Sequence, residues 1–85
     1  MLKFYTTYAI YEDGLAHACE PTDNFDKAVD AYAETKDAGY PSFVYIIGLW
    51  RGGSSPFTHD VTIDAQNRFI DRLNERGQEH PRWLA

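Results

Sequence analysis

The chain has 85 residues, of which 44% are hydrophobic and 15% aromatic, and its formal net charge is −5. This length suits one domain with a single small core, because a chain of this size buries only about 60–65% of its unfolded surface. The apolar content excludes an intrinsically disordered chain. The acidic balance argues against direct binding to DNA or RNA, which usually begins with cations that neutralise phosphates.

Cysteine usage and hydropathy indicate the compartment. A lone cysteine, Cys19, excludes an internal disulfide and is typical of a reducing environment. No apolar run approaches the roughly 20 residues that a membrane-spanning helix needs. Residues 1–4 lead directly into a strand pattern, so we expect no signal peptide. We therefore expect a cytoplasmic protein that makes no contact with a membrane.

Two strands are predicted at the start of the chain. Residues 2–11 are rich in aromatic and β-branched types, and residues 15–20 form a second run that ends at Pro21. The turn signal between them is Glu12-Asp13-Gly14. The two strands therefore predict a β-hairpin.

The register of this hairpin depends on the turn. A two-residue turn would pair Ile10 with His17, whereas a three-residue loop with Gly14 in the left-handed region would pair Ile10 with Ala16. We prefer the three-residue loop because it gathers five side chains on one face: Phe4, Tyr8, Ile10, Ala16 and Ala18. The other face then holds Tyr5, Tyr11, His17 and Cys19.

A helix is predicted over residues 24–38. Asp23 is a suitable N-cap, because its side chain can accept hydrogen bonds from the first amide groups. The apolar seam of this helix consists of Phe25, Val29 and Tyr32. Gly39, followed by Tyr40 and Pro41, predicts the end of the helix.

The second half predicts two more strands and a helix. Residues 42–50 are apolar at odd and even positions and predict a central strand covered on both faces. A flexible loop is expected at 51–56, and residues 57–63 alternate as a half-buried strand with Phe57, His59, Val61 and Ile63 on one side.

Asp64 is suited to cap a last helix over residues 65–76 that ends at Gly77. The apolar stripe of this helix consists of Ala65, Phe69, Ile70 and Leu73. Residues 78–85 are expected to form a tail that docks Trp83 and Leu84 on the body or on a partner.

The predicted fold is α+β with the element order ββαββα. Two amphipathic helices would cover one face of a four-stranded, mainly antiparallel sheet, which gives a two-layer sandwich. Residues 1–77 would form this single domain and residues 78–85 the tail. The sequence shows no internal repeat and no low-complexity segment.

Carboxylates repeat along the first predicted helix. At about 100° per residue they fall within an arc of roughly 80°, and they are Asp23, Asp26, Asp30, Glu34 and Asp37. Residues 1–50 hold eight acids and three lysines, whereas residues 51–85 hold five acids and five arginines. All the excess negative charge (3 − 8 = −5 against 5 − 5 = 0) therefore lies in the first half.

Two interpretations of this acidic row stay open. A solvated helix face is often charged, and the row then serves solubility alone. A functional acidic surface is the alternative, because like charges four residues apart destabilise a helix slightly and only Lys27 and Lys36 lie near them. Carboxylates about 5–6 Å apart along a helix also approximate the spacing of phosphates on a nucleic-acid strand.

Arginines repeat at four-residue intervals on the last helix, as Arg68, Arg72 and Arg76. Local pairing with Asp71 and Glu75 is the plain interpretation. The sharper hypothesis is that the arginine row of one molecule meets the acidic row of another in a salt-sensitive homodimer.

The sequence predicts no enzyme and no cofactor. The only candidates for a soft-metal or catalytic set are His17, Cys19, His59, Asp60 and His80, but their spacing matches no metal motif. Gly52-Gly53-Ser54-Ser55 lacks the lysine of a phosphate-binding loop. Tyr5, Tyr11 and Tyr45 could form an aromatic sheet face, which suits a protein contact better than a nucleic acid because Lys3 is almost its only basic neighbour.

In size, acidity and lack of a catalytic motif, the chain resembles the small phage-encoded inhibitors that mimic DNA, anti-CRISPR and anti-restriction proteins among them. This resemblance implies a non-catalytic inhibitor whose acidic helix occupies a groove meant for a phosphate backbone. Arginine and lysine residues of a partner protein would pair with Asp26, Asp30, Glu34 and Asp37, and tyrosines would supply apolar anchorage. The expected binding residues are Asp23, Asp26, Asp30, Glu34, Asp37, Glu12, Asp13, Tyr5 and Tyr11.

Two alternatives remain. The chain could be a homo-oligomeric structural or regulatory domain, with Trp83, Leu84 and the tyrosine face buried between subunits. It could also be a small metal protein or enzyme that uses His17, Cys19 and His59.

Overall fold

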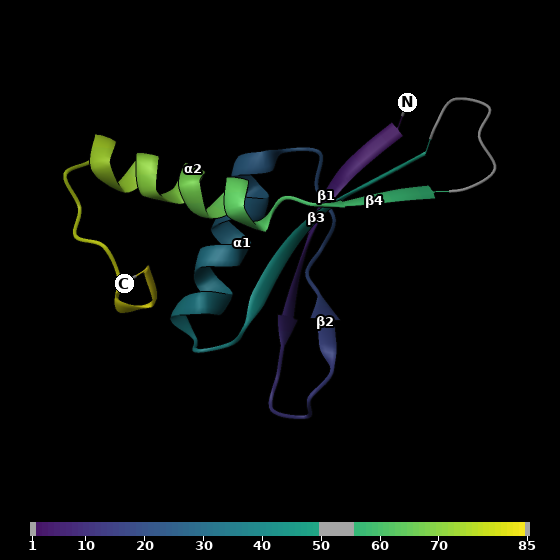
Figure 1. Cartoon of the computed structure of the whole chain (residues 1–85), viewed down its shortest axis with the longest axis horizontal. Helices are drawn as coiled ribbons and strands as arrows, with labels where there is room; N and C mark the ends of the chain where they lie inside the picture. Colours follow the sequence, from purple (N-terminus) through teal and green to yellow (C-terminus); the bar gives the residue numbers. More distant parts are fainter. Residues whose placement is uncertain (1, 50–55, 85) are drawn as a thin grey trace.

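The structure is a computed structural model that describes residues 2–49 and 56–84. Its elements follow in the order β1 (Leu2–Ile10), β2 (Ala16–Ala18), α1 (Phe25–Asp37), β3 (Ser42–Leu49), β4 (Pro56–Asp60) and α2 (Thr62–Glu75), with a short 3-10 helix at Arg82–Leu84. The four strands form one antiparallel sheet in the order β2-β1-β3-β4, and both helices lie to one side of it (Figure 1). The predicted α+β class and the order ββαββα are confirmed.

The hairpin has the predicted register. Ile10 pairs with Ala16 and Tyr8 with Ala18. Gly14 adopts a φ of 78°, in the left-handed region that favours glycine. The three-residue loop is therefore confirmed, with strand β2 shorter than the predicted 15–20.

Helix α1 begins one residue later than predicted, so the assignment of Asp23 as its cap was wrong. Asn24 is the N-cap, and its Oδ1 accepts from the amides of Asp26 at 2.9 Å and Lys27 at 3.3 Å. The hydroxyl of Thr22 in turn accepts from the Asn24 amide at 3.1 Å. Asp23 and Asn24 are both good capping residues, and Thr22 decides between them by holding Asn24 in place. The predicted end is correct, since Gly39 has a φ of 92°.

Helix α2 begins earlier than predicted, and Asp64 lies in its first turn instead of capping it. Strand β4 ends at Asp60, whose Oδ1 accepts from the Thr62 amide at 2.8 Å. The Val61 amide donates to the Val44 carbonyl at 2.8 Å, and the Val44 amide donates to the Thr62 hydroxyl at 3.0 Å. These bonds carry the chain from sheet to helix without a loop, so the predicted strand at 57–63 is cut short and its last residue is helical.

The core lies between the sheet and the two helices. Its buried cluster consists of Ala28, Val29, Tyr32, Val44, Val61 and Ala65, with Tyr5, Phe25, Ile46, Phe69 and Trp83 packed against it. Thr7 is also buried, and its hydroxyl donates to the Ala28 carbonyl at 3.0 Å. The predicted apolar seam of α1 and the Ala65 and Phe69 positions of the α2 stripe therefore belong to this core.

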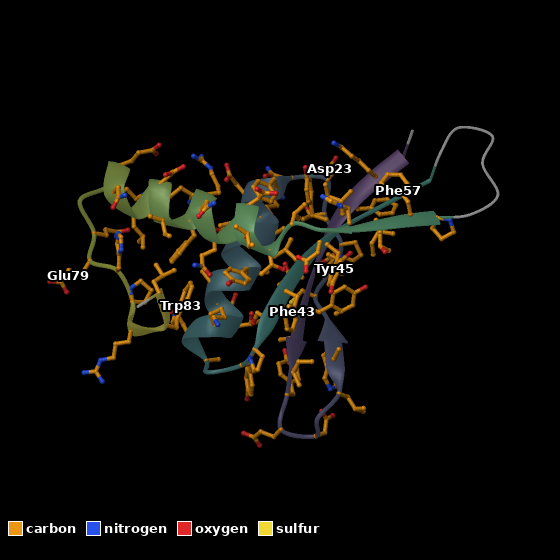
Figure 2. All side chains as sticks on the ribbon, in the orientation of Figure 1. Asp23, Phe43, Tyr45, Phe57, Glu79 and Trp83 are labelled. Atoms are coloured by element: carbon orange, nitrogen blue, oxygen red, sulfur yellow. The ribbon has the colours of Figure 1, made fainter. Side chains whose placement is uncertain are left out.

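The C-terminal tail folds back under α2 and docks on the body (Figures 1 and 2). The Trp83 ring stacks on Phe69 at 5.4 Å and meets Tyr32 edge-on at 5.8 Å. Its Nε1 donates to Asp37 Oδ1 at 2.6 Å, and the Lys36 ammonium lies 5.6 Å from the ring centroid. The tail thus closes the gap between the C-terminal parts of the two helices.

Strand β3 is interior to the sheet, but the prediction that both its faces are covered was wrong. Val44 is fully buried beneath the helices. The preceding residue, Phe43, has its side chain on the opposite face of the sheet and is 38% exposed. Both helices pack on the same side, and no described element covers the other side. The loop predicted at 51–56 and the motif at Gly52–Ser55 lie outside the described residues, except for Pro56.

Candidate interaction surfaces

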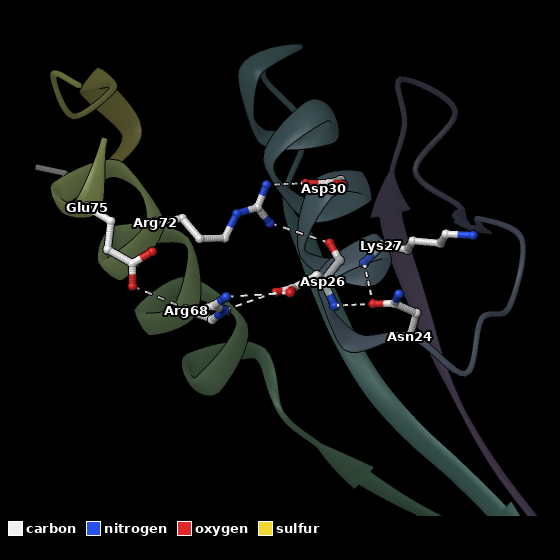
Figure 3. A network of polar contacts seen from close by, with 7 residues as sticks. All are labelled: Asn24, Asp26, Lys27, Asp30, Arg68, Arg72 and Glu75. Carbon is white, nitrogen blue, oxygen red and sulfur yellow. Dashed lines mark hydrogen bonds and ion pairs between the residues drawn. The ribbon is translucent and has the colours of Figure 1, made fainter. Parts of the chain in front are cut away.

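The acidic row of α1 meets the arginine row of α2 within the same chain (Figure 3). Arg68 donates from Nε to Asp26 Oδ1 at 3.0 Å and from Nη2 to Asp26 Oδ2 at 3.5 Å. Arg72 donates to Asp30 Oδ1 and, at 3.5 Å, to the Asp26 carbonyl. Two of the five carboxylates are therefore used to hold the helices together.

The electrostatics of this seam follow from the contacts. The Arg68 hydrogen bonds hold the pKa of the Asp26 carboxyl below its ordinary value of 3.8, and the same bonds raise the pKa of the Arg68 guanidinium. The Arg72 side chain is 15% exposed, so its stem packs between the helices while its head reaches Asp30. Of the local pairing expected along α2, Arg68 lies 3.9 Å from Glu75.

The other three carboxylates do not form one surface. Asp37 accepts from the Trp83 indole at the C-terminal end of α1. Glu34 lies on the opposite flank of α1, where it lines a cavity with Cys19 and Tyr40. Asp23 is exposed before the helix begins (Figure 2), and no ion pair involves it or Glu34 among the described residues. The row predicted as a single acidic face is thus divided over four places.

The acids of the hairpin turn are partly engaged. Asp13 Oδ1 accepts from the Leu15 amide at 2.9 Å, and its Oδ2 lies 2.9 Å from His17 Nε2. The Leu15 amide and then His17 hold the pKa of the Asp13 carboxyl below its ordinary value. Glu12 is exposed beside it.

The three tyrosines expected on one sheet face are divided. Tyr5 faces the helices and packs on Phe25 with ring centroids 5.0 Å apart. Tyr11 stacks on His17 at 4.6 Å and meets Tyr40 at 4.7 Å. Tyr45 pairs across the strands with Thr6, on the opposite face from Tyr5, so the predicted grouping was wrong.

The face of the sheet away from the helices, here called the open face, is apolar and aromatic. Its strands contribute Phe4, Thr6, Tyr8, Ile10, Ala16, Ala18, Phe43, Tyr45, Ile47, Thr58 and, at the β4 edge, Asp60. A shallow depression of about 410 Å³ lies on it, lined by Tyr8, Ile10, Ala16, Phe43, Tyr45 and Thr58. Tyr8 and Tyr45 meet edge-on there, with centroids 5.7 Å apart.

Sequence reasoning named part of this face but gave it no role. The chosen hairpin register already placed Phe4, Tyr8 and Ile10 on one face. Residues 42–50 are apolar at both odd and even positions, which indicates that both faces of β3 would gain from contact with another layer. Both helices were correctly predicted on one face of the sheet, and the missing step was the conclusion that the other face of β3 then stays uncovered.

The candidate metal set does not assemble in the described residues. No group of three His, Cys, Asp or Glu side chains there could hold a metal ion. His17 pairs with Asp13, and burial raises the pKa of the Cys19 thiol, with a further contribution from Glu34. Across residues 2–49 and 56–84, no helix has the length and apolar character needed to cross a membrane.

Comparison with protein-family models, with curated protein sequences and with solved structures found no match to this chain.

Proposed function

We propose that this chain is a non-catalytic protein-interaction module that binds through the open face of its sheet, and that its partner there is a second copy of itself. The observation that carries the proposal is the contrast across β3, where a buried Val44 is followed by Tyr45 on a face that no described element covers. A continuous apolar sheet face of this kind marks an interaction surface.

The core on the covered side is small, and this supports an obligate partner. The buried hydrophobic residues include four alanines, Ala9, Ala28, Ala33 and Ala65, and the largest fully buried side chains are Val29, Val44 and Thr7. Larger side chains, such as Tyr8, Phe43 and Tyr45, lie on the open face. A second core between two open faces would add the apolar burial that a chain of this length lacks.

Charge and shape favour a second copy as the occupant. The only charged side chain on the open face among the described residues is Asp60, at the β4 edge, and its carboxylate already accepts from Thr62. A face without basic or acidic anchors suits a partner that is equally uncharged, and a two-fold axis supplies that partner from the same surface. The net charge of −5 does not oppose this contact, because most of the carboxylates lie on the helices and the hairpin turn.

The size of the face approaches that of a specific interface. At about 3.3 Å per residue, strands of nine and eight residues are about 28 Å long, and strands about 4.8 Å apart give a projected area of roughly 400 Å² per copy once the short edge strands are allowed for. Protruding aromatic side chains raise the accessible area above this projection. Two opposed faces give roughly 800 Å² in projection, and the side chains that protrude from them bring the buried area toward the roughly 1,000 Å² that a specific interface needs.

Light scattering tests the dimer. The expected mass of the wild-type protein is twice 9.7 kDa, and it should not change between low and high salt because the contact is apolar. Phe43→Lys places a charge on the open face at a partly exposed position and should give a monomer. Ile63→Lys is the matched control, because Ile63 is 77% exposed on α2, in the other layer. A monomeric wild type, or equal effects of the two variants, would overturn the proposal.

A second candidate is the inhibitor with an acidic surface that the resemblance implies, bound to a basic surface of another protein. The observation in its favour is that Asp23 and Glu34 remain exposed without an ion pair among the described residues. Asp26 and Asp30 are already compensated by arginines, so they contribute less than the sequence suggested.

The experiment for this candidate reverses charges that the fold does not use. A salt-sensitive partner captured by the wild type should be lost by the Asp23→Lys/Glu34→Lys variant. It should be retained by Asp64→Lys/Glu79→Lys, which removes the same charge from exposed positions elsewhere. Capture that both variants retain equally contradicts the acidic-surface candidate.

A further inference from the structure

A small cavity lies between the C-terminal half of α1 and the hairpin. It has a volume of about 220 Å³ and is lined by Tyr11, Cys19, Ala31, Glu34, Thr35, Ala38 and Tyr40. We call it the Glu34 pocket. It lies on the helix side of the sheet, so it is separate from the open face.

The walls of this pocket are aromatic. The rings of Tyr11 and Tyr40 lie 4.7 Å apart at 60°, and His17 stacks on Tyr11 at 4.6 Å. These two ring contacts restrain the orientation of Tyr11. Aromatic faces held in this way attract a cation through the ring quadrupole.

The electrostatics of the pocket are negative. Glu34 is the one charged residue among its described lining residues. The Cys19 thiol stays protonated at neutral pH because burial and Glu34 both raise its pKa, so it adds no second charge. Ala38 caps the C-terminus of α1, where the helix dipole is negative. The basic residues of α1 lie elsewhere, with Lys36 over Trp83 and Lys27 on a neighbouring cavity.

The pocket has no cation of its own to balance this field. Thr35, its other polar side chain, is already bonded to Ser42 and to helix carbonyls. The Glu34 carboxylate has no hydrogen bond or ion pair to a side chain in the described part of the chain. A planar guanidinium would meet a carboxylate that can accept two parallel hydrogen bonds while it stacks on a tyrosine ring, which an ammonium cannot do.

We propose that the Glu34 pocket binds the side chain of an arginine carried by a partner protein, paired with the Glu34 carboxylate and stacked against Tyr11 and Tyr40. The proposal deepens the interaction role of the chain, and only the source of the arginine rests on that role. The preference of the pocket for a guanidinium does not depend on the open face or on the oligomeric state.

The probe for the test is blocked arginine, N-acetyl-arginine amide, titrated into the isotopically labelled wild-type protein. The NMR chemical shifts of the backbone amides should change for residues 31–40 and for the residues around Cys19. N-acetyl-citrulline amide has the same shape without the charge and should leave these shifts unchanged. Equal shifts with citrulline would overturn the proposal.

Matched variants localise the effect. Glu34→Gln should weaken binding of blocked arginine about tenfold or more, because a charge-assisted contact is lost. Tyr40→Leu should weaken it about threefold through the lost ring contact. Glu79→Gln is the control, since Glu79 is exposed in the segment after α2 (Figure 2) and does not line the pocket, and it should bind as the wild type does. Retained affinity in Glu34→Gln, or equal loss in Glu79→Gln, contradicts the assignment.

A last comparison decides the source of the cation. A blocked pentapeptide with a central arginine should bind several-fold more tightly than methylguanidinium, because a second cavity adjoins the pocket at Ala31 and can contact the rest of the peptide. Equal affinity of the two probes would overturn a protein partner in favour of a small free cation. Failure of the dimer test leaves these titrations unaffected, so the two proposals fail separately.

Discussion

The two faces of the sheet use the same strands in opposite ways. On the covered face, small side chains such as Ala9, Thr7 and Val44 are almost fully buried, because α1 and α2 lie close over them. On the open face, large side chains such as Phe43 and Tyr45 remain accessible. The chain therefore also carries large apolar side chains on a face that no described element covers.

The difference in cover between the two faces suggests that their side chains have different roles, one in folding and one in association. Side chains on the covered face determine whether the monomer folds, and those on the open face determine what the folded monomer associates with. A substitution should therefore change stability or association according to its parity along β3. Neighbouring positions on that strand provide the sharpest comparison.

The largest expected effect is at Val44. Val44→Ala should lower the free energy of unfolding by about 2 kcal/mol, because it removes two methyl groups from a fully buried site and leaves a cavity. Denaturant titration at a fixed protein concentration measures this loss. The light-scattering mass should stay that of the wild type.

The neighbouring substitution Phe43→Ala tests the opposite parity. The midpoint of unfolding of the wild type should rise with protein concentration if the open faces associate, and Phe43→Ala should abolish that rise. A Phe43 variant that keeps the concentration dependence, or a Val44 variant that loses it, breaks the division between the faces.

Most of the fold could be predicted because local signals agree with it. Gly14, Gly39 and Gly77 mark the turn and the two helix ends, and each adopts the positive φ that such positions need. The errors lie where a tertiary contact decides between adjacent residues. Thr22 selects Asn24 over Asp23 as a cap, and the bonds between Val44 and the segment 61–62 start α2 early.

The candidate sites were harder to predict because they depend on which helices meet. The spacing of Asp26 and Asp30 shows that they share a face, but it does not show that Arg68 and Arg72 occupy the same interface. From the sequence, the arginines were expected to pair locally along α2 or, in the sharper hypothesis, with the acidic row of another molecule, whereas the structure joins the two rows within one chain. Likewise, Tyr40 served only as part of a stop signal, and its place beside Glu34 arises from the way the chain turns back after α1.

A smaller effect is expected at the seam between the helices, on the covered side. Arg72→Ala should cost about 1 kcal/mol of unfolding free energy, through lost packing of its stem and the lost contact with Asp30. A double-mutant cycle with Asp30→Ala separates the ion pair from the packing. Arg76→Ala is the control, because Arg76 is exposed and forms no ion pair among the described residues. A coupling free energy of zero between positions 30 and 72 would show that this ion pair does not stabilise the contact between the helices.

The smallest effect is a pH dependence that should also follow the division between the faces. The folded-state pKa of Asp26 lies below the ordinary value of 3.8, mainly because Arg68 donates to its carboxylate. Its contribution to stability is therefore present above pH 3.8 and is lost as the pH falls through the folded-state pKa. Thermal unfolding between neutral pH and about pH 3 should show this loss, and Asp26→Asn should make the curve shallower. Phe43→Ala should leave the acid dependence per monomer unchanged, because the open face has no carboxylate other than Asp60 in its described part. If Phe43→Ala flattens the curve as much as Asp26→Asn does, the acid-sensitive groups are coupled to association and the two faces are not independent.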